Sequence, residues 1–585
     1  MNTLKKAIKQ VPGILFSFFK NGGWASYLYV VLVLVKSFVP LVQTIGIAEL
    51  VRNINNSTSA FWLAIIVICL LYPNLHYKII EFIESKIKYS IAKRIDIKMM
   101  DLSCDIEFIN FENSETYDKL KRVSNGGSII FGAGRNLLII IERTIEVFSL
   151  EIYLISFSPI LALLFSFLLI ILVAICCKTA NLSWKSYLGT SELEREIEYT
   201  FKVITDHKNI SELKLFRAYV PLKEKYNNKI DELSKIQLKT MLKNMVLQNI
   251  STLLLSVIVI IVLFFYSYLL IRGDVSSALF AGLFASIINI MNVISVYNIN
   301  LSNFTQSLMS FDNLMEFFRY NKKSSIQDKY SDNNKRIPVK YIVQVCNIWF
   351  SYSKDERMVL QNLSLNISEG ECVVLVGENG CGKSTLVKLI LGLYAPSKGF
   401  IQIMNKPAVE LLAEERPELV AIFQDYTKYN LSIRNILCDD KKIDDEELYD
   451  VLRKVGLYDF ISTLNDGLDT ILGNTFQGST DFSEGQWQKL NIARVILSDS
   501  KILIFDEPTA SLDPVAEANF YQEIMNLKTH KTMVIVSHRL GVVGIADKVC
   551  YMNCGKIVDI GSHYELMERC TDYSSMYQKQ AKWYK

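Results

Sequence analysis

The fold of the C-terminal half of this chain is decided by the stretch Gly377-Glu378-Asn379-Gly380-Cys381-Gly382-Lys383-Ser384-Thr385, which fits the phosphate-binding loop pattern. An apolar run typical of a buried strand, 372–376, precedes it, and a segment with helical periodicity, 386–393, follows it. In that setting the glycines let successive N–H groups turn towards a polyphosphate, whose outer charge Lys383 neutralises while Ser384 binds Mg²⁺. We therefore expect these nine residues, the phosphate loop, to hold ATP with Mg²⁺ rather than to form a bare Gly-rich turn.

Length and composition exclude several classes of protein. A chain of 585 residues implies more than one domain, and half of its residues are apolar. A net charge of +3, without a basic stripe interleaved with aromatic residues, gives no basis for nucleic acid as a partner. The 11 cysteines lack the paired spacing of metal sites, so we expect reduced intracellular thiols.

The first 320 residues contain long uncharged runs and are expected to form a helical membrane domain in the lipid bilayer. The number of crossings should be even, because the lysine-rich N-terminus and an ATP-binding domain both belong in the cytoplasm. We expect six spans, at about 24–50, 61–77, 137–157, 159–177, 245–271 and 278–296.

Charge placement supports this topology. Lysine and arginine residues gather in 78–135 and 178–243, whereas the expected external links contain only Arg52 and Arg272. That asymmetry is the positive-inside pattern. The polar, lysine-rich stretch 321–338 reads as a linker, after which we expect a soluble α/β domain over residues 339–585.

Four ionisable side chains at membrane depth are candidates for a substrate path: Lys36, Glu142, Glu146 and Glu151. Such groups either pair with one another or face a wet cavity. Glu142 and Glu146 share one helix face, and Lys36 is the expected partner of Glu146. Two interpretations stay open: these residues form structural pairs or lie in the cytoplasmic extension of the helix, or they line an acidic translocation wall suited to a cationic substrate.

A further apolar strand is expected at 502–506, and it ends in a carboxylate that a second one follows directly. Asp506 is suited to holding Mg²⁺ through water, and Glu507 to polarising an attacking water as general base. Acidic residues at strand ends are common, but the phosphate loop upstream makes this pair specific. We therefore expect ATP hydrolysis with Glu507 as the catalytic base.

A second anion site is expected just before and at the start of the helix 487–497, where Ser483, Gly485 and Gln486 lie. Hydroxyl and amide groups at a helix N-terminus bind anions. One domain already has its phosphate loop, so a second anion site indicates that the γ-phosphate is held between two copies of the domain.

Three single residues complete the expected site. Gln424 and His538 each follow an expected strand and could report on the γ-phosphate, although a lone histidine there is usually structural. Tyr352 lies 31 residues before Lys383. From the residues alone it could stack on adenine or, equally, belong to the core or an edge.

In combination these motifs resemble the ATP-binding cassette (ABC) transporters, specifically exporter-type half-transporters, over essentially the whole chain. The resemblance implies a six-helix all-α transmembrane domain of ABC exporter type, followed by an α/β P-loop ATP-binding cassette domain. It raises the expectation that Tyr352 stacks on adenine. It also implies catalytic roles for Glu507, His538 and Gln424, metal contacts from Ser384, Gln424 and Asp506, and a D-loop at Ser511-Leu512-Asp513.

The resemblance also implies a mechanism. Two ATP molecules would be bound between the phosphate loop of one half-transporter and the signature segment, 482–486, of the other. Closure of that sandwich would drive alternating access, transmitted by cytoplasmic helix turns near 111–117 and 213–219. The expected location is the bacterial cytoplasmic membrane, with the N-terminus and the ATPase domain in the cytoplasm.

The phrases 423–429, 485–489, 506–508 and 513–517 are similar to those of bacterial lantibiotic-type peptide exporters. The function implied is ATP-driven export of a peptide, of the modified bacteriocin or lantibiotic type, with modification enzymes as possible partners. The alternatives are a multidrug or lipid exporter, and a membrane-anchored ATPase with a sensing or immunity role. With about 20 residues before the first span, we expect no N-terminal leader peptidase.

The signature segment departs from the family's usual Leu-Ser-Gly-Gly-Gln at two positions, Phe482 and Glu484. A carboxylate at Glu484 lies near where the γ-phosphate should dock, which predicts weaker closure or slower hydrolysis. Such a change can mark one half of an asymmetric heterodimer. Because Lys383, Glu507 and His538 are all retained, we expect a homodimer with low basal turnover.

Overall fold

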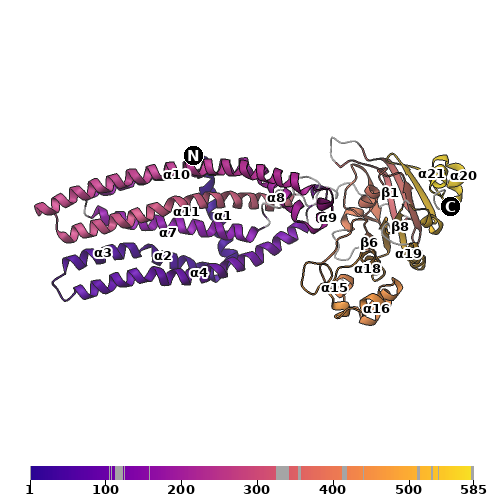
Figure 1. Ribbon diagram of the computed structural model, residues 1–585, viewed down its shortest axis with the longest axis horizontal. Helices are drawn as coiled ribbons and strands as arrows, with labels where there is room; N and C mark the ends of the chain where they lie inside the picture. Colours follow the sequence, from indigo (N-terminus) through magenta and orange to yellow (C-terminus); the bar gives the residue numbers. More distant parts are fainter. Residues whose placement is uncertain are drawn as a thin grey trace. The chain divides into compact units, whose positions relative to one another are not determined.

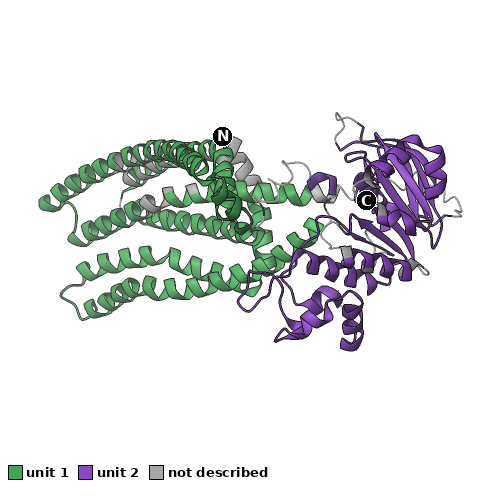
Figure 2. Ribbon diagram, turned by 45° about the vertical axis from the view of Figure 1, so that its right-hand side comes forward, with its two compact units in different colours: residues 1–105, 114–323 green, residues 106–113, 324–585 purple. Residues whose placement is uncertain are grey.

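The computed structural model describes the chain except for residues 1, 105, 107, 112–122, 124, 157, 324–340, 353–357, 412–417, 439–440, 510–513, 529–530, 538 and 582–585. It divides into two compact units (Figure 2). The first unit comprises Met1–Asp105 and Ser114–Lys323, and the second comprises Ile106–Asn113 and Ser324–Lys585. The expected linker, 321–338, therefore lies outside the described residues from 324 onwards.

The first unit is helical, and several of its helices are unusually long (Figure 1). Many of their large apolar side chains are exposed, among them Ile160, Phe264 and Ile271. Exposed apolar surface of this kind suits contact with lipid. The helices are α1 (Asn2–Gly22), α2 (Trp24–Ser37), α3 (Val39–Arg52), α4 (Ser59–Cys104), α7 (Gly126–Ile155), α8 (Pro159–Thr205), α9 (His207–Leu215), α10 (Tyr219–Arg272) and α11 (Ser277–Lys323).

The helix boundaries refine the expected spans. The first expected span is divided into α2 and α3 at Phe38, and α3 carries a proline in its first turn, where the missing N–H is tolerated. By length and composition, Trp24–Arg52 and Ser59–Cys104 could each cross a membrane, and Ser256–Arg272 and Ser277–Val293 are shorter apolar stretches. The number of crossings stays a prediction.

Glycines on α7 allow close helix packing. A Cβ on Gly127 would lie 2.4 Å from the Cα of Ala92 in α4, and a Cβ on Gly134 would lie 2.2 Å from the ring of Phe18 in α1. The Gly127 N–H also donates to the Asp96 carboxylate at 3.0 Å. These contacts leave no room for a larger residue, so α4 and α7 meet almost backbone to backbone, and the ring of Phe18 on α1 packs directly on the α7 backbone.

The N-terminal helix α1 packs its apolar residues against protein. Ile14 and Phe18 are fully buried. Its last turn is held by α4, because Arg94 donates to the Lys20 carbonyl at 2.9 Å and Ser90 donates to the Asn21 carbonyl at 3.0 Å. Both bonds satisfy carbonyls that a helix C-terminus leaves unpaired.

The packing predicts different costs for two glycines of α7. Gly127→Ala should destabilise the protein by about 1–3 kcal/mol, because the methyl group must displace the backbone of α4. Gly132→Ala is the matched control, since its Cβ would have no neighbour within 4 Å, and alanine favours the helix. Thermal unfolding in detergent measures both, and equal melting temperatures for the two variants would contradict the close α4–α7 contact.

The second unit contains two sheets. A four-stranded sheet has the order β2-β1-β4-β5, and a six-stranded sheet has the order β10-β9-β3-β8-β7-β6 (Figure 1). The strands are β1 (Val343–Phe350), β2 (Leu360–Ile367), β3 (Cys372–Gly377), β4 (Lys398–Ile403), β5 (Lys406–Pro407), β6 (Leu419–Ile422), β7 (Ile502–Asp506), β8 (Thr532–Val536), β9 (Lys548–Asn553) and β10 (Lys556–Gly561).

The strands β3, β7 and β8 are buried along their whole length and run parallel. Parallel strands covered on both faces read as continuous apolar runs, which is how the sequence predicts them. The helices around the sheets are α13 (Lys383–Ile390), α14 (Ala408–Leu411), α15 (Ile433–Cys438), α16 (Asp445–Lys454), α17 (Tyr458–Ser462), α18 (Glu484–Ile496), α19 (Pro514–Lys528), α20 (His563–Arg569) and α21 (Thr571–Ala581). The expected order, a helical domain followed by an α/β domain, is confirmed.

A short segment from the helical half of the sequence belongs to the second unit. The helix α5 (Phe108–Phe111) stacks the ring of Phe108 edge-on against Tyr394, with centroids 5.3 Å apart. Ile109 packs on the core formed by β1–β4 and α13. This is the start of the first expected cytoplasmic turn, 111–117, of which residues 112–117 lie outside the described residues.

Candidate functional site

The register of the large sheet brings the expected site residues to one edge. Val536 of β8 pairs with Leu375 of β3 on one side and with Asp506 of β7 on the other. Because all three strands are parallel, their carboxyl ends meet at the same edge of the sheet. The phosphate loop, which begins at Gly377, and the Asp506-Glu507 pair are therefore neighbours.

The phosphate loop has the expected strand, loop and helix order, from β3 into α13. Gly380 and Gly382 have φ values of 78° and 104°, in the left-handed region that favours glycine. The Lys383 ammonium donates to the carbonyls of Gly377 and Glu378, at 2.8 and 3.0 Å. Lys383 is the one cationic side chain among residues 377–385. Its ammonium folds back and binds to carbonyl groups of the same loop.

Ser384 and Asp506 form an oxygen-rich pair that suits Mg²⁺. The Ser384 hydroxyl donates to the Asp506 carboxylate at 3.3 Å. Burial raises the pKa of Asp506, an effect that the Ser384 hydrogen bond and the Lys383 charge oppose. A buried carboxylate beside a hydroxyl is the donor set that a hard divalent cation prefers, and a cation there would stabilise the charged form.

Glu507 leaves the strand in a strained conformation. Its φ is 51°, which few residues other than glycine adopt, and its N–H donates to the Val536 carbonyl at 3.0 Å. That bond fixes the backbone of Glu507 between the ends of β7 and β8. Backbone strain of this kind persists where surrounding structure enforces it, often at functional sites. The expected His538 and Asp513 lie outside the described residues.

Tyr352 lies beside the first turn of α13. Its hydroxyl is 2.8 Å from the Thr385 hydroxyl, and its ring stands edge-on to Phe350 and Tyr394, with centroids 5.1 and 5.5 Å apart. The aromatic neighbours hold the ring in place next to the phosphate loop. This position suits the adenine-stacking role that we expect.

The signature segment, 482–486, forms the N-terminus of α18. The Gln486 N–H donates to the Ser483 hydroxyl at 3.3 Å, and the Ser483 N–H donates to the Gln486 side chain at 2.8 Å, which makes a capping box. Phe482 is buried and packs against Phe460 and Trp487, with centroids 5.5 and 6.0 Å apart. The departure at Phe482 therefore fills the core between α15, α17 and α18.

Comparisons with known proteins agree with this geometry. Residues 360–510 match the family model described as ABC transporter. A solved bacterial Atm1-family ABC exporter with ATP bound superimposes with a TM-score of 0.79, covering 95% of this chain and 98% of that chain at 20% sequence identity. Residues 360–510 are thus an ATPase domain of the ABC transporter type, and the chain as a whole has the fold of an ABC exporter.

Curated relatives match the chain over most of its length. The nisin transport ATP-binding protein NisT of Lactococcus lactis subsp. lactis is 28% identical, over 95% of this chain and 93% of the relative. The subtilin transport ATP-binding protein SpaT of Bacillus subtilis is also 28% identical, over 86% of this chain and 82% of the relative.

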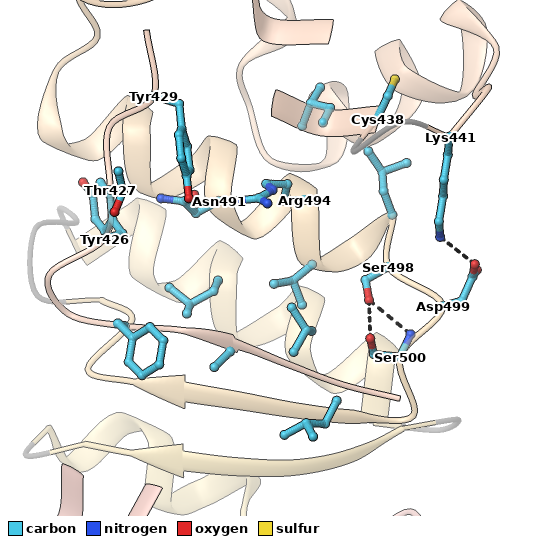
Figure 3. A pocket seen from close by; sticks show the side chains of 18 of the residues that line it. Tyr426, Thr427, Tyr429, Cys438, Lys441, Asn491, Arg494, Ser498, Asp499 and Ser500 are labelled. Atoms are coloured by element: carbon cyan, nitrogen blue, oxygen red, sulfur yellow. Dashed lines mark hydrogen bonds and ion pairs between the residues drawn. The ribbon is translucent and has the colours of Figure 1, made fainter. Parts of the chain in front are cut away.

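A second feature of the ATPase unit is a pocket that the sequence did not predict. The pocket has a volume of about 570 Å³ and lies between β6, the segment after it and the helices α15 and α18 (Figure 3). Tyr426, Tyr429, Asn491 and Arg494 are among its lining side chains. Gln424 is exposed where β6 has ended, directly before this lining. We call residues 424–429 the Gln424 segment.

Three of the four expected substrate-path residues of the membrane domain, Lys36, Glu142 and Glu146, lie in ion pairs. The structure pairs Lys36 with Glu142, at 2.6 Å, and not with Glu146 as expected. Glu146 instead pairs with Arg143, one turn away on its own helix, at 2.8 Å. Glu142 and Glu146 are almost fully buried, and Glu151 is buried as well. The two cations balance Glu142 and Glu146, which favours structural pairing over an acidic wall.

Cys381 offers a chemical test of the phosphate loop. Its thiol is buried, with the sulfur 3.9 Å from the Lys383 ammonium, so an adduct there must displace the lysine. We expect N-ethylmaleimide to block binding of a fluorescent ATP analogue, MgATP to protect, and Cys381→Ser to resist. Cys554→Ser, which removes an exposed thiol, is the matched control and should be blocked like the wild type. Equal loss of binding in Cys381→Ser and the wild type would contradict the placement.

Proposed function

We propose that this transporter exports a peptide across the bacterial cytoplasmic membrane at the expense of ATP. The single observation that carries the peptide class is the near full-length similarity to proteins named for nisin and subtilin transport. ATP hydrolysis coupled to transport rests on the ABC transporter match and on the site around Lys383, Asp506 and Glu507. Modification enzymes that supply the peptide are possible partners.

The residues divide the chemistry between them. Lys383 and the loop N–H groups bind the β- and γ-phosphates, and Tyr352 stacks on the adenine. Ser384, Asp506 and Gln424 would hold Mg²⁺, which supplies neutralisation of phosphate charge when it is bound. Glu507 polarises the attacking water as general base, with His538 beside the γ-phosphate.

The working form is a homodimer, with each ATP held between one phosphate loop and the partner's signature segment. The hydrogen bonds of Ser483 and Gln486 lie within their own motif, and the Ser483 hydroxyl accepts rather than donates in that contact. Its proton can therefore be donated to a phosphate oxygen of the second copy's ATP.

Motion passes from the ATPase to the membrane domain through helix turns. Leu215 and Phe216, at the turn between α9 and α10, are 78% and 70% exposed, which is unusual for large apolar side chains away from lipid. We expect this turn to be one of those that transmit the motion. The N-terminus and the ATPase domain lie in the cytoplasm, as the positive-inside pattern requires.

A multidrug or lipid substrate is the competing function. The acidic wall cannot decide between the substrates, because Lys36 and Arg143 compensate the charges of Glu142 and Glu146. The distinction therefore has to come from the substrate that stimulates turnover.

ATPase activity of the purified transporter in lipid vesicles tests the proposal. We expect a cationic modified peptide to stimulate the wild type and Glu507→Gln to lose turnover by a factor on the order of 10²–10⁴, as for removal of a general base. Glu447→Gln on α16, an exposed glutamate, is the matched control and should hydrolyse ATP like the wild type.

The outcomes separate the alternatives. Stimulation by lipids or hydrophobic drugs but not by peptide would reject the peptide class while leaving export intact. A wild type that binds ATP but never hydrolyses it would reject the homodimer and point to a second half-transporter with the usual signature.

A further inference from the structure

The unusual glutamate of the signature segment has partners of its own. Glu484 is the first residue of α18, and its carboxylate accepts hydrogen bonds from Tyr426, at 3.1 Å, and from the Lys428 ammonium. The Tyr426 hydroxyl is also 3.0 Å from the Glu484 carbonyl. Both donors belong to the Gln424 segment, 58 and 56 positions away in the sequence.

The negative charge of Glu484 is neutralised in this contact. Lys428 balances the carboxylate, and Tyr426 remains a neutral donor, because burial and the nearby Glu484 carboxylate raise the pKa of its hydroxyl. A second link joins the same two elements, since the Arg494 guanidinium of α18 lies 5.8 Å from the ring centre of Tyr429. Three residues of the Gln424 segment thus hold the signature helix.

We propose that Lys428, supported by Tyr426, is a positioning residue for the ATP sandwich: it neutralises Glu484 and ties the signature segment to the Gln424 segment. The inference rests on the proposed function, in which the signature segment meets the γ-phosphate of the second copy. A carboxylate left alone at that position would repel the phosphate. Paired with Lys428, it becomes part of a neutral contact that fixes the N-terminus of α18.

The solvent exposure of the Lys428–Glu484 pair determines in which state of the protein it contributes. The Lys428 and Glu484 side chains are 35% and 63% exposed, and ion pairs at such a surface contribute little to stability. Closure of two copies on ATP removes water from the signature segment, and charge interactions strengthen as the surrounding dielectric falls. The cost of removing Lys428 from Glu484 therefore falls on ATP binding between two copies rather than on folding.

This pairing changes the expectation from the sequence that Glu484 slows turnover. That expectation assumed an unpaired carboxylate beside the γ-phosphate. The structure provides a cation for it from a segment that lies nearby only after folding. In the wild type, the signature segment then presents its N–H groups to the phosphate with little net repulsion.

A double-mutant cycle tests the proposal. We expect Lys428→Ala to raise the KM for ATP about three- to fivefold, the range of an interaction of modest strength, with a much smaller change in kcat. Glu484→Gln should not raise KM, and Lys428→Ala/Glu484→Gln should return KM to the wild-type value. Arg453→Ala, which removes an exposed ion pair with Asp450 on α16, is the matched control and should leave KM unchanged.

The same cycle in the Glu507→Gln background, read as equilibrium binding of a fluorescent ATP analogue, keeps this test independent of turnover. If the wild type fails to hydrolyse ATP, the proposed function fails while the binding cycle still reports on the pair. If Lys428→Ala lowers the affinity equally with and without the Glu484→Gln substitution, the proposal is overturned, because Lys428 would then act without Glu484. No change in any variant would overturn it too, since the pair would then be an inert surface contact.

Discussion

Parallel pairing of β3, β8 and β7 is the constraint on which the ATP site depends. The phosphate loop and the Asp506-Glu507 pair are more than 120 residues apart in the sequence, and only this register places Ser384 within 3.3 Å of Asp506. The N–H of Glu507 is bound to the end of β8, so a shift of either strand would also move the proposed base. The buried apolar strands thus set the position of every polar group at the sheet edge.

The sheet edge holds two charged groups, Asp506 and Lys383, that are both buried. Burying a charged group costs free energy. Asp506 is nearly buried, with its pKa raised, and Lys383 is buried as well, with its ammonium held by two loop carbonyls. Each group lacks the hydration it would have in water, so a phosphate beside Lys383 and a divalent cation beside Asp506 would compensate their charges. Burial of the two groups therefore favours a nucleotide bound together with a cation.

The sequence predicts the strand, loop and helix of this site because their signals are local. The strand, loop and helix around residues 377–385 follow from glycine spacing and from periodicity, which neighbouring residues determine. The ion pairs of the membrane domain were not predictable in the same way. Glu142 and Glu146 share one helix face, so sequence spacing alone gives no reason for Lys36 to choose Glu142, and that choice is made by how α2 packs on α7. The pocket beside the Gln424 segment needs three elements from separate parts of the chain, and no single stretch encodes it.

The two departures from the family's signature pattern also depend on contacts that the sequence does not reveal. Considered one at a time, the changes at Phe482 and Glu484 would both be expected to weaken the function of the signature segment. In the folded protein, Phe482 fills a core with Phe460 and Trp487, and Glu484 is met by Tyr426 and Lys428. Each change is matched by a residue elsewhere in the same subdomain, so its effect depends on the partner rather than on the motif. A signature segment should therefore be judged together with the Gln424 segment against which it folds, because the charge that it presents is set by both.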